Sequence, residues 1–427
     1  MPIKKSNIII NKSKTSLLEL KRELFSLLQK YRIPNKNIVY SKNNDFENIQ
    51  YFCREIQDVL FDLYGQETTS QLPSEKIYED YKYIPRIKEN HFQVYSRRYI
   101  GNKHKLLSWI FSIITKECLG NSFADIFSGT GIIAAEASRI YKKIIVNDFL
   151  YSNYAIYKAF FENAKYNLMK IEAIINSYNS VSPAYISDNY FSRNFGGRFF
   201  SANDAKKIGF IRDNIENNKT NLTEKEYYIL ITSLIYSVDK IANTVGHFDA
   251  YIKKSDMKDS FVLKQIDVFP IDDISIYRQD ANLLVKNISA DIVYIDPPYN
   301  SRQYSRFYHV LENLTKWNKP ELYGIALKPQ AENMSDYCRA NAKSKFYELI
   351  KDLQAKYIVV SYNNTYDSKS DSSKNKISLD NIKNILENKG STKIFDKDYR
   401  YFTAGNTDFQ NHKEYLFVTR AKSAKHN

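Results

Sequence analysis

The feature that most constrains the fold of this chain is an apolar run that stops at two prolines, DIVYIDPPY over residues 291–299. Its β-branched and aromatic residues predict a buried strand. The prolines end that strand in a stiff turn, because each fixes its own φ and Pro298 also restricts Pro297. Asp296 is therefore expected at the carboxyl end of the strand, the edge at which open α/β sheets bind ligands.

The residues of this turn suit the methylation of an exocyclic amine on a nucleobase. Such an amine is a weak nucleophile, because its lone pair is delocalised into the ring. The Asp296 carboxylate and the Pro297 carbonyl would each accept one N–H bond and favour a more pyramidal nitrogen. Tyr299 would stack on a base that has left the duplex. The alternative is a rigid turn whose acid only caps it.

The charge of the chain favours a polyanionic partner. The 427 residues, 43% of them hydrophobic, exceed one ordinary domain and carry a formal net charge of +14. Such a balance suits nucleic acid. AT-rich coding would also raise the lysine content, so the charge supports nucleic-acid binding without establishing it.

The cysteines and the apolar runs bear on the cell compartment of the protein and on its need for a metal. Cys53, Cys118 and Cys338 lie far apart, which argues against a disulfide framework or a zinc site. No apolar run approaches membrane-spanning length, and the run at residues 8–10 is too short for a signal segment. We therefore expect a cytoplasmic protein that needs no metal.

Residues 1–90 are predicted to form a helical N-terminal extension. Residues 17–28 and 51–64 carry apolar side chains at helical spacing, and Gly65 follows at a plausible helix end. This segment contains no catalytic constellation. The chain then enters a basic turn, RRYIGNKHK over residues 97–105, ahead of an apolar helix. Arg98 would suit DNA phosphates there, a ligand carboxylate would suit the same turn, and a solvated basic turn is the alternative.

A strand, a glycine turn and a helix are predicted over residues 123–137. The turn SGTG at residues 128–131 would let a ligand approach the backbone closely. A second strand at residues 143–147 ends at Asp148, whose carboxylate can hold both ribose hydroxyls of a nucleoside. The glycine pattern is a G-x-G and not the full G-x-G-x-x-G. A G-x-x-x-x-G-K-[ST] phosphate loop is also absent.

Residues 151–275 are predicted to be mainly helical. We expect a helix over residues 154–175, a basic helical stretch after Arg198, and a helix that opens with a capping box at residues 223–226. Arg198 is a candidate for contact with nucleic acid. The last helix leads into a loop, residues 243–253, that mixes hydrogen-bonding groups, aromatics and a cation. Such a loop suits base edges or phosphates, through Asn243, His247, Tyr251 and Lys253. An ordinary polar loop is the alternative.

The segments around the opening strand add further candidates. Asp280 would either accept from an adenine amino group or cap a surface helix. Beyond residue 299, cations and aromatics interleave as they do in nucleic-acid grooves, at Arg302, Tyr304 and Arg306, unless they form a solvated face. Residues 357–364 predict another buried strand. Residues 399–402 and 414–418 predict a C-terminal antiparallel hairpin.

Five of these segments, taken in order, carry a family likeness. They are YIGNK at residues 99–103, DIFSGTG at residues 125–131, Asp148, Asp280 and DPPY at residues 296–299. In these segments and their order, the chain resembles the Dam-like class of adenine-specific DNA methyltransferases. That class includes modification enzymes of restriction–modification systems. The likeness runs from about residue 95 to about residue 420. Tyr99 departs from it, since Dam-like members often have tryptophan there, and residues 1–90 have no counterpart in the minimal family.

The resemblance implies an α/β fold: a doubly wound S-adenosylmethionine-dependent methyltransferase sheet with an inserted, mainly helical target recognition region. The catalytic domain would comprise residues 91–150 and 276–427, and the recognition domain residues 151–275. The cofactor would be S-adenosyl-L-methionine. Double-stranded DNA would be the substrate, and a cognate restriction endonuclease is a possible partner.

The resemblance also implies roles for single residues. Lys103 and Asp125 would lie near the methionine end of the cofactor, Asp148 on its ribose and Asp280 near its adenine. The full cofactor set would be Tyr99, Lys103, Asp125, Phe127, Gly129, Gly131, Asp148 and Asp280. Asp296, Pro297 and Tyr299 would hold a flipped adenine while its N6 takes the methyl group by direct displacement. That reaction needs no cysteine nucleophile, whereas methylation of cytosine C5 would.

Three rival functions stay open at this point. The same segments would serve an amino-methyltransferase that acts on RNA or on cytosine N4. A catalytically silent nucleic-acid-binding protein on the same fold is a second rival, and the intact Asp296 and Tyr299 argue against it. A nicotinamide dehydrogenase is the third, and the incomplete glycine pattern counts against it.

Overall fold

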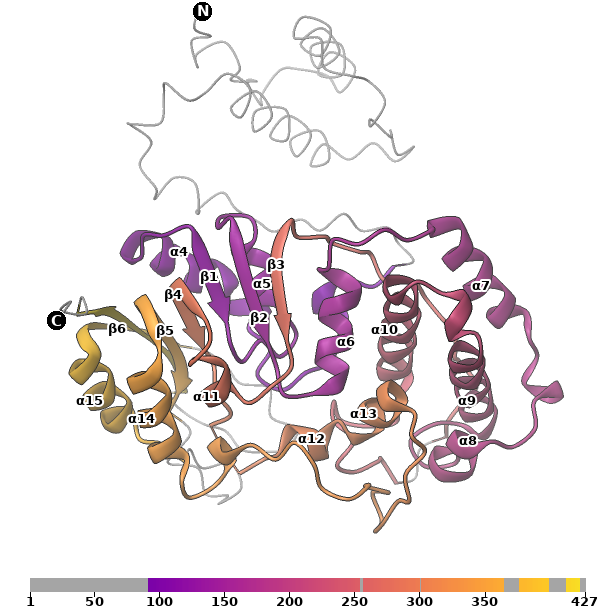
Figure 1. The fold of residues 1–427 in the computed structure, drawn as a ribbon. Coiled ribbons are helices and arrows are strands. Elements are labelled where there is room, and N and C mark those ends of the chain that lie inside the picture. The colour runs from indigo at the N-terminus through magenta and orange to yellow at the C-terminus, as the bar shows by residue number, and fades with distance from the viewer. Residues whose placement is uncertain (1–90, 254–255, 300, 365–375, 399–411, 423–427) are drawn as a thin grey trace, which may run out of the picture. The chain divides into compact units, whose positions relative to one another are not determined.

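A seven-stranded sheet carries the fold (Figure 1). The computed structural model describes residues 91–253, 256–299, 301–364, 376–398 and 412–422, so the predicted helical extension at residues 1–90 lies outside the described residues. The strand order is β3-β2-β1-β4-β5-β7-β6. In chain order the strands are β1 (Ser122–Asp125), β2 (Lys143–Asn147), β3 (Asp273–Tyr277), β4 (Ser289–Ile295), β5 (Gln354–Asn363), β6 (Gly390–Asp398) and β7 (Lys413–Ala421).

The first five strands run parallel, and β7 runs antiparallel to both β5 and β6. The chain builds outward from β1, first through β2 to β3 and then from β4 to β5 on the other side. The carboxyl ends of β1 and β4 therefore meet where the strand order reverses. Open α/β sheets bind ligands at such a point.

Alternate residues of the strands face two separate cores. In β4, Ile292 and Tyr294 pack on one side of the sheet, and Val293 and Ile295 on the other. The first face is covered by α4 (Leu107–Glu117), α5 (Ile132–Ala137) and α6 (Tyr151–Phe160). The second face is covered by α11 (Ala281–Leu284), α14 (Ala342–Asp352) and α15 (Leu379–Lys389), which lie in front of the sheet in Figure 1. The sheet is thus covered by helices on both faces.

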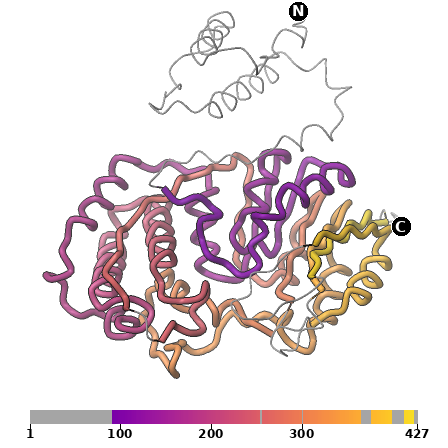
Figure 2. Tube along the Cα trace, turned by 180° about the vertical axis from the view of Figure 1, so that it is seen from behind, coloured from indigo at the N-terminus to yellow at the C-terminus, as the bar shows by residue number. Residues whose placement is uncertain are grey.

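The chain between β2 and β3 is mainly helical. After α6 it forms α7 (Leu168–Ser180), α8 (Tyr190–Phe195), α9 (Ala202–Asn217) and α10 (Glu224–Ile241). Their apolar side chains belong to the same core as the helices on the first face. Figure 2, drawn from behind, shows these helices beside the purple helices of that face. These helices therefore share the core that lies on the first face of the sheet.

Short elements complete the described chain. Between β4 and β5 lie α12 (Tyr304–Phe307) and α13 (His309–Lys316). Single 3-10 turns occur at Val94–Ser96, His104–Leu106, Pro183–Tyr185, Lys219–Asn221 and Asp336–Cys338. Among the residues that the structure describes, no helix is both long enough and apolar enough to cross a membrane.

One predicted helix is split in two. The expected helix over residues 154–175 ends with α6 at Phe160, and α7 begins at Leu168 with Asn167 as its cap. The break is held by Lys225 of α10, whose buried ammonium donates to the carbonyls of Lys158 (3.0 Å) and Glu162 (2.7 Å). These carbonyls would otherwise be orphaned where α6 ends. The predicted capping box at residues 223–226 is confirmed, with Thr223 and Glu226 bonded reciprocally.

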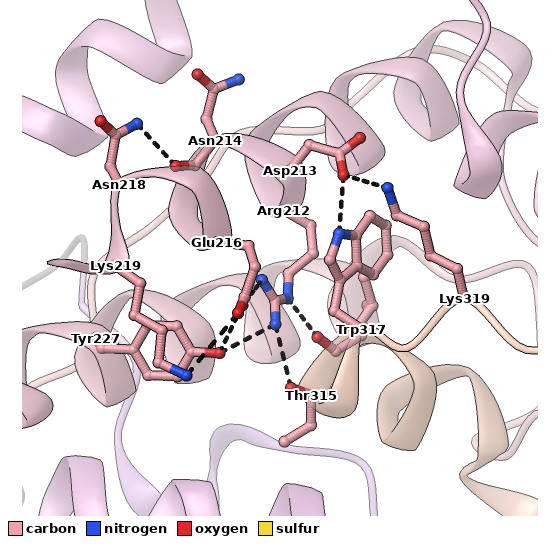
Figure 3. Close-up of polar contacts among 11 residues, drawn as sticks. Arg212, Asp213, Asn214, Glu216, Asn218, Lys219, Tyr227, Thr315, Trp317 and Lys319 are labelled. Carbon is pink, nitrogen blue, oxygen red and sulfur yellow. Dashed lines mark hydrogen bonds and ion pairs between the residues drawn. The ribbon is translucent and has the colours of Figure 1, made fainter.

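The basic stretch predicted after Arg198 contains a fully buried cation, Arg212. Arg212 of α9 is fully buried and donates to the carbonyls of Leu314 (2.6 Å) and Thr315 (3.2 Å) at the end of α13 (Figure 3). Its guanidinium also contacts Glu216 at 2.9 Å and the hydroxyl of Tyr227 at 3.1 Å. Arg212 therefore joins α9 to α13 and is not available to DNA.

The structure describes only the second strand of the predicted C-terminal hairpin. The second strand is present as β7, which contains residues 414–418. Its antiparallel partner is β6, Gly390–Asp398, which ends just before the predicted first strand. Residues 399–402 themselves lie outside the described residues.

Candidate active site

An open cleft lies at the carboxyl edge of the sheet. It is lined by residues 99–103, 125–130, 132–133, 147–150, 279–281, 294, 296–299, 303–305, 333, 335 and 337. The three residues predicted to hold a target base, Asp296, Pro297 and Tyr299, therefore share one cleft with most of those predicted to hold a cofactor.

The glycine turn brings Gly129, which has no side chain, to the wall of the cleft. Gly129 has φ +52°, and a Cβ there would come within 3.0 Å of the Tyr99 ring. Its N–H donates to the Asp148 carboxylate at 2.9 Å, and the Leu150 N–H donates to the other oxygen of that carboxylate, also at 2.9 Å. Asp148 is thereby fixed at the end of β2. Burial raises its pKa in spite of these bonds.

Gly131 has a different place from the one predicted. It has φ +79° but does not line the cleft. A Cβ there would lie 2.8 Å from the Phe161 ring and 3.1 Å from the Tyr157 ring. The structure thus gives Gly131 a role in packing the first turn of α5 against aromatic side chains at the end of α6, whereas the prediction placed it at the cofactor.

Asp125 presents a buried carboxylate without hydrogen bonds of good geometry. It is 1% exposed, and neither of its side-chain oxygens has a partner within the described part of the chain. Burial raises its pKa well above the usual range, and the charges of Asp296 and Asp148 raise it further. A bound cation would relieve both the missing bonds and the repulsion.

Lys103 links the basic turn to Asp296. Its ammonium lies 3.2 Å from Asp296 and 2.8 Å from Glu414 of β7, and its side chain is 6% exposed. Burial alone would lower the pKa of Lys103, but the carboxylates of Asp296 and Glu414 raise it well above its usual value. Lys103 therefore remains a cation at the floor of the cleft.

Asp296 keeps an unusual balance of charge. Burial raises the pKa of Asp296, Lys103 lowers it and Glu414 raises it, and together they give a pKa of about 7. Its side chain retains 16% exposure, and that part opens to the cleft. A carboxylate with this proton affinity accepts hydrogen bonds strongly near neutral pH.

The far wall of the cleft is built from Tyr299 and a loop that faces it. Tyr299 is buried, and its ring meets Tyr362 edge-on at 5.9 Å. In the loop, Asn333 has φ +50°, and its buried side-chain nitrogen has no partner among the described residues. Gln303 fixes this loop by bonding both backbone groups of Ser335, at 2.9 and 2.8 Å. The loop is thus held at the cleft by the chain that follows Tyr299.

The basic turn is positioned by a stack of aromatic rings. The rings of Tyr99 and Tyr308 lie 4.9 Å apart and nearly parallel, and the buried Arg97 guanidinium is 5.0 Å from each. Arg97 also donates to Asn153 of α6 at 2.6 Å. The Tyr308 hydroxyl accepts from the Ile100 N–H at 2.8 Å. These contacts tie residues 97–103 to α6 and to the start of α13.

Asp280 caps the start of α11, which is one of the two roles predicted for it. Its carboxylate accepts from the N–H groups of Asn282 (2.9 Å) and Leu283 (3.2 Å) at the start of α11. It also lines the cleft, so the cap and a ligand contact are compatible. Phe127 lines the same part of the cleft and meets Tyr337 edge-on at 5.1 Å.

Comparison with known proteins identifies the family of this chain. The family model of the D12 class N6 adenine-specific DNA methyltransferases matches residues 99–366, which span the cleft from the basic turn to β5. The chain belongs to this D12 class. The prediction of an adenine-specific DNA methyltransferase is thereby confirmed, and the seven-stranded α/β sheet is the methyltransferase sheet of a D12 enzyme.

Individual relatives agree with the D12 assignment. Type II methyltransferase M.NlaIII of Neisseria lactamica is 31% identical over 344 residues, which cover 75% of this chain and 98% of that protein. Type II methyltransferase M.CviAII of Paramecium bursaria Chlorella virus 1 is 30% identical over 75% of this chain and 97% of its own length. Modification methylase StsI of Streptococcus sanguinis is 38% identical, and the match covers 62% of this chain and 44% of that protein.

The residues predicted to bind DNA are mostly engaged within the D12 fold itself. Arg98 donates to the carbonyls of Asp239, Ala242 and Thr244 and so caps the end of α10. Of the predicted set, only Tyr304 lines the cleft, and its hydroxyl donates to the carbonyl of Ile100 at 3.2 Å. Three more of the set form hydrogen bonds with backbone carbonyls: Arg198 with Asn194, Asn243 with Arg198 and Ile252, and Arg306 with Pro329. Three others contact aromatic rings: His247 and Arg302 that of Phe307, and Tyr251 that of Phe199. Lys253 is exposed.

Several residues in or next to the cleft were not found from the sequence. Glu414 lies on β7, which also carries Lys413 and Arg420, so its charge alone gave no signal. Arg97 was hidden beside Arg98 in a run of cations. Asn333 had no signal, because its place depends on how the loop after α13 folds back. Within the described ranges, no cluster of His, Cys, Asp or Glu could hold a metal ion.

Proposed function

We propose that the cleft binds S-adenosylmethionine and a flipped adenine side by side, and that Asp296 accepts from the amine that is methylated. The observation that carries this proposal is the placement of Asp296. It stands at the end of β4, opens to the cleft, and shares that cleft with the unpaired carboxylate of Asp125. The D12 family makes methyl transfer to adenine N6 of DNA the reaction, so the cleft needs one place for a methyl donor and one for the base.

The residues of the first half of the cleft fit S-adenosylmethionine. Asp125 would accept from the ammonium of its methionine part, because neither of its side-chain oxygens has a hydrogen-bond partner among the described residues. The backbone at Gly129 would lie against the donor, and Asp148 would accept from the ribose hydroxyls. Phe127 would pack on the adenine ring near Asp280. When bound, S-adenosylmethionine supplies a methyl group activated by a sulfonium sulfur.

The second half of the cleft fits the target base. Asp296 and the carbonyl of Pro297 would each accept one N–H of the adenine amine, which localises the nitrogen lone pair. Tyr299, held edge-on by Tyr362, would stack on the base. On methylation, N6 would lose a proton on the side of Asp296. Lys103 would hold the Asp296 carboxylate in place throughout.

The helical region between β2 and β3 would act as the target recognition domain. It lies in the chain between two strands that end at the cleft, and its loop at residues 243–253 bonds to the last residue of α12, with Phe248 donating to the Phe307 carbonyl at 2.7 Å. We infer that Lys253, together with Tyr304 at the cleft, contacts DNA, because Lys253 is exposed and Tyr304 lies beside Tyr99 at 5.3 Å. By similarity to type II modification enzymes, a cytoplasmic role beside a restriction endonuclease is proposed.

The test is methyl transfer from labelled S-adenosylmethionine to mixed-sequence duplex DNA, followed by mass spectrometry of the nucleosides. Wild type is expected to form N6-methyladenine. Asp296→Ala is expected to lose on the order of a hundredfold or more in rate while it still binds the cofactor, because it removes an acceptor aimed at the transition state. Asp273→Ala, an exposed acid on β3, is the control and should keep the wild-type rate.

The outcomes separate the proposal from its rivals. An Asp296→Ala enzyme that turns over normally would refute the assigned role of Asp296. N4-methylcytosine in place of N6-methyladenine would redirect the substrate, and label that enters RNA but not DNA would do the same. Cofactor binding without any transfer would support a silent protein on this fold.

A further inference from the structure

Glu414 places a buried carboxylate next to the Lys103–Asp296 pair, although Glu414 does not itself line the cleft. It is 2% exposed and lies on β7, opposite Asn363 of β5. The three residues Leu416, Phe417 and Val418 that follow on the same strand are buried and apolar. A buried acid in such a strand costs stability unless it is paired, so its partners are informative.

The partners of Glu414 fix one of its oxygens firmly. Oε1 lies 2.8 Å from the Lys103 ammonium and accepts from the Ser361 hydroxyl at 2.7 Å. Lys103 is 3.2 Å from Asp296, so the ammonium lies nearer to Glu414 than to Asp296. One buried cation is therefore shared by two buried carboxylates, and Ser361 holds the second carboxylate where it competes for that cation.

This sharing matters for what Asp296 can accept. A carboxylate that is bound tightly by one ammonium has much of its charge neutralised, and it becomes a weaker acceptor for any other N–H group. By drawing the ammonium to itself, Glu414 leaves Asp296 with charge to offer to the cleft. The surplus negative charge is expensive in a buried site, which is typical of groups arranged for a reaction.

We propose that Glu414 is a positioning residue for methyl transfer, which holds Lys103 partly away from Asp296 so that Asp296 can accept from the target amine. The inference rests on the proposed role of Asp296. Glu414 itself need not touch the substrate, because it acts through Lys103 and Asp296.

Four titratable groups face Asp296 from the surrounding elements: Lys103 from the basic turn, Glu414 from β7, Asp125 from β1 and Tyr294 from β4. Glu414 raises the pKa of Asp296 and Lys103 lowers it. Removing the two charges one at a time should therefore move the pKa of Asp296 in opposite directions, which a purely structural role would not do.

The experiment is the single-turnover rate of methyl transfer to duplex DNA, measured across pH for wild type, Glu414→Gln and Lys103→Met. For Glu414→Gln we expect the plateau rate to fall about tenfold or more, with the affinities for DNA and S-adenosylmethionine close to wild type. Its acid limb should move to lower pH by roughly half a unit or more. For Lys103→Met the acid limb should move to higher pH.

Glu226→Gln is a matched control. Glu226 is also 2% exposed and is paired with a lysine, Lys170, at 2.6 Å, but Lys170 does not line the cleft, whereas Lys103 does. The control variant should leave both the rate and the pH profile unchanged. If Glu414→Gln folds poorly, Ser361→Ala serves instead, because it removes the hydroxyl that fixes Glu414 and should give a smaller shift of the acid limb in the same direction.

The outcomes for Glu414 and for Asp296 are separable. If Asp296→Ala is inactive while Glu414→Gln and Ser361→Ala keep the wild-type plateau and acid limb, the role of Glu414 is refuted and that of Asp296 stands. If Asp296→Ala remains active, the role of Asp296 itself fails, and that of Glu414 fails with it. A shift of the Glu414→Gln limb to higher pH would also overturn the proposal.

Discussion

Asp125 shows at the scale of one residue what a binding site costs the free protein. Its carboxylate is buried without good partners, and its pKa is raised well above 3.8 by burial and by neighbouring acids. The protonated form is therefore the more stable one in the fold. Its contribution to stability is complete below the unfolded pKa, and it is lost as the pH rises through the raised folded pKa.

This linkage gives a prediction for Asp125→Asn. The variant is neutral at every pH, so its free energy of unfolding should exceed that of wild type at pH 8 and the gain should shrink toward pH 5. Each unit of raised pKa corresponds to about 1.4 kcal/mol. The same variant should bind S-adenosylmethionine more weakly. Urea unfolding without cofactor at both pH values measures the first effect, and a variant less stable than wild type at pH 8 would falsify the account.

Single residues were predictable from the sequence where a turn or a strand end placed them. Asp296, Asp148 and Lys103 each follow from a local pattern, and the structure brings all three to one cleft. Glu414 was not predictable, because its partner Lys103 is more than three hundred residues away in the chain. Such a pairing exists only once β7 lies antiparallel beside β5.

At the scale of elements, the turn between β1 and α5 depends on packing as much as on ligand binding. Gly131→Ala is expected to lower the free energy of unfolding by about 1–3 kcal/mol for the left-handed backbone, and further for the contact with Phe161 and Tyr157. Gly197→Ala is the matched control, because Gly197 has φ +70° and no atom within 4 Å of its would-be Cβ. Equal losses in urea unfolding would mean that the aromatic contact does not matter.

Strands were predicted better than helix boundaries for a physical reason. The strands at residues 122–125, 143–147 and 289–295 are short apolar runs bounded by polar residues, and the sequence marks both ends. The end of α6 is set by Lys225, a side chain on another helix, which no local pattern reveals. Tertiary contacts of this kind override helical periodicity.

At the scale of the whole molecule, the net charge of +14 and the D12 family point to the same substrate. The cations of the chain do not form one DNA-binding surface, since Arg212 is buried and Arg98 caps a helix. The charge of the chain therefore overstates the number of phosphates that it can contact. A measurement of that number would show how much of the charge is used.

The affinity for duplex DNA is expected to fall steeply with salt. Each phosphate contact adds about 0.9 to the slope of log Kd against log salt, so roughly six contacts would weaken binding about a thousandfold between about 50 and about 200 mM. The affinity for S-adenosylmethionine, measured by calorimetry over the same range, should change little, because the residues proposed to hold it, Asp125 and Asp148, are buried and salt screens buried charges less. Lys253→Ala should reduce the slope by the contribution of about one phosphate contact. Arg212 is unsuitable as a probe, because its side chain bonds to the end of α13. A DNA affinity that does not vary with salt would mean that binding rests on the cleft alone and that the basic composition has no part in it.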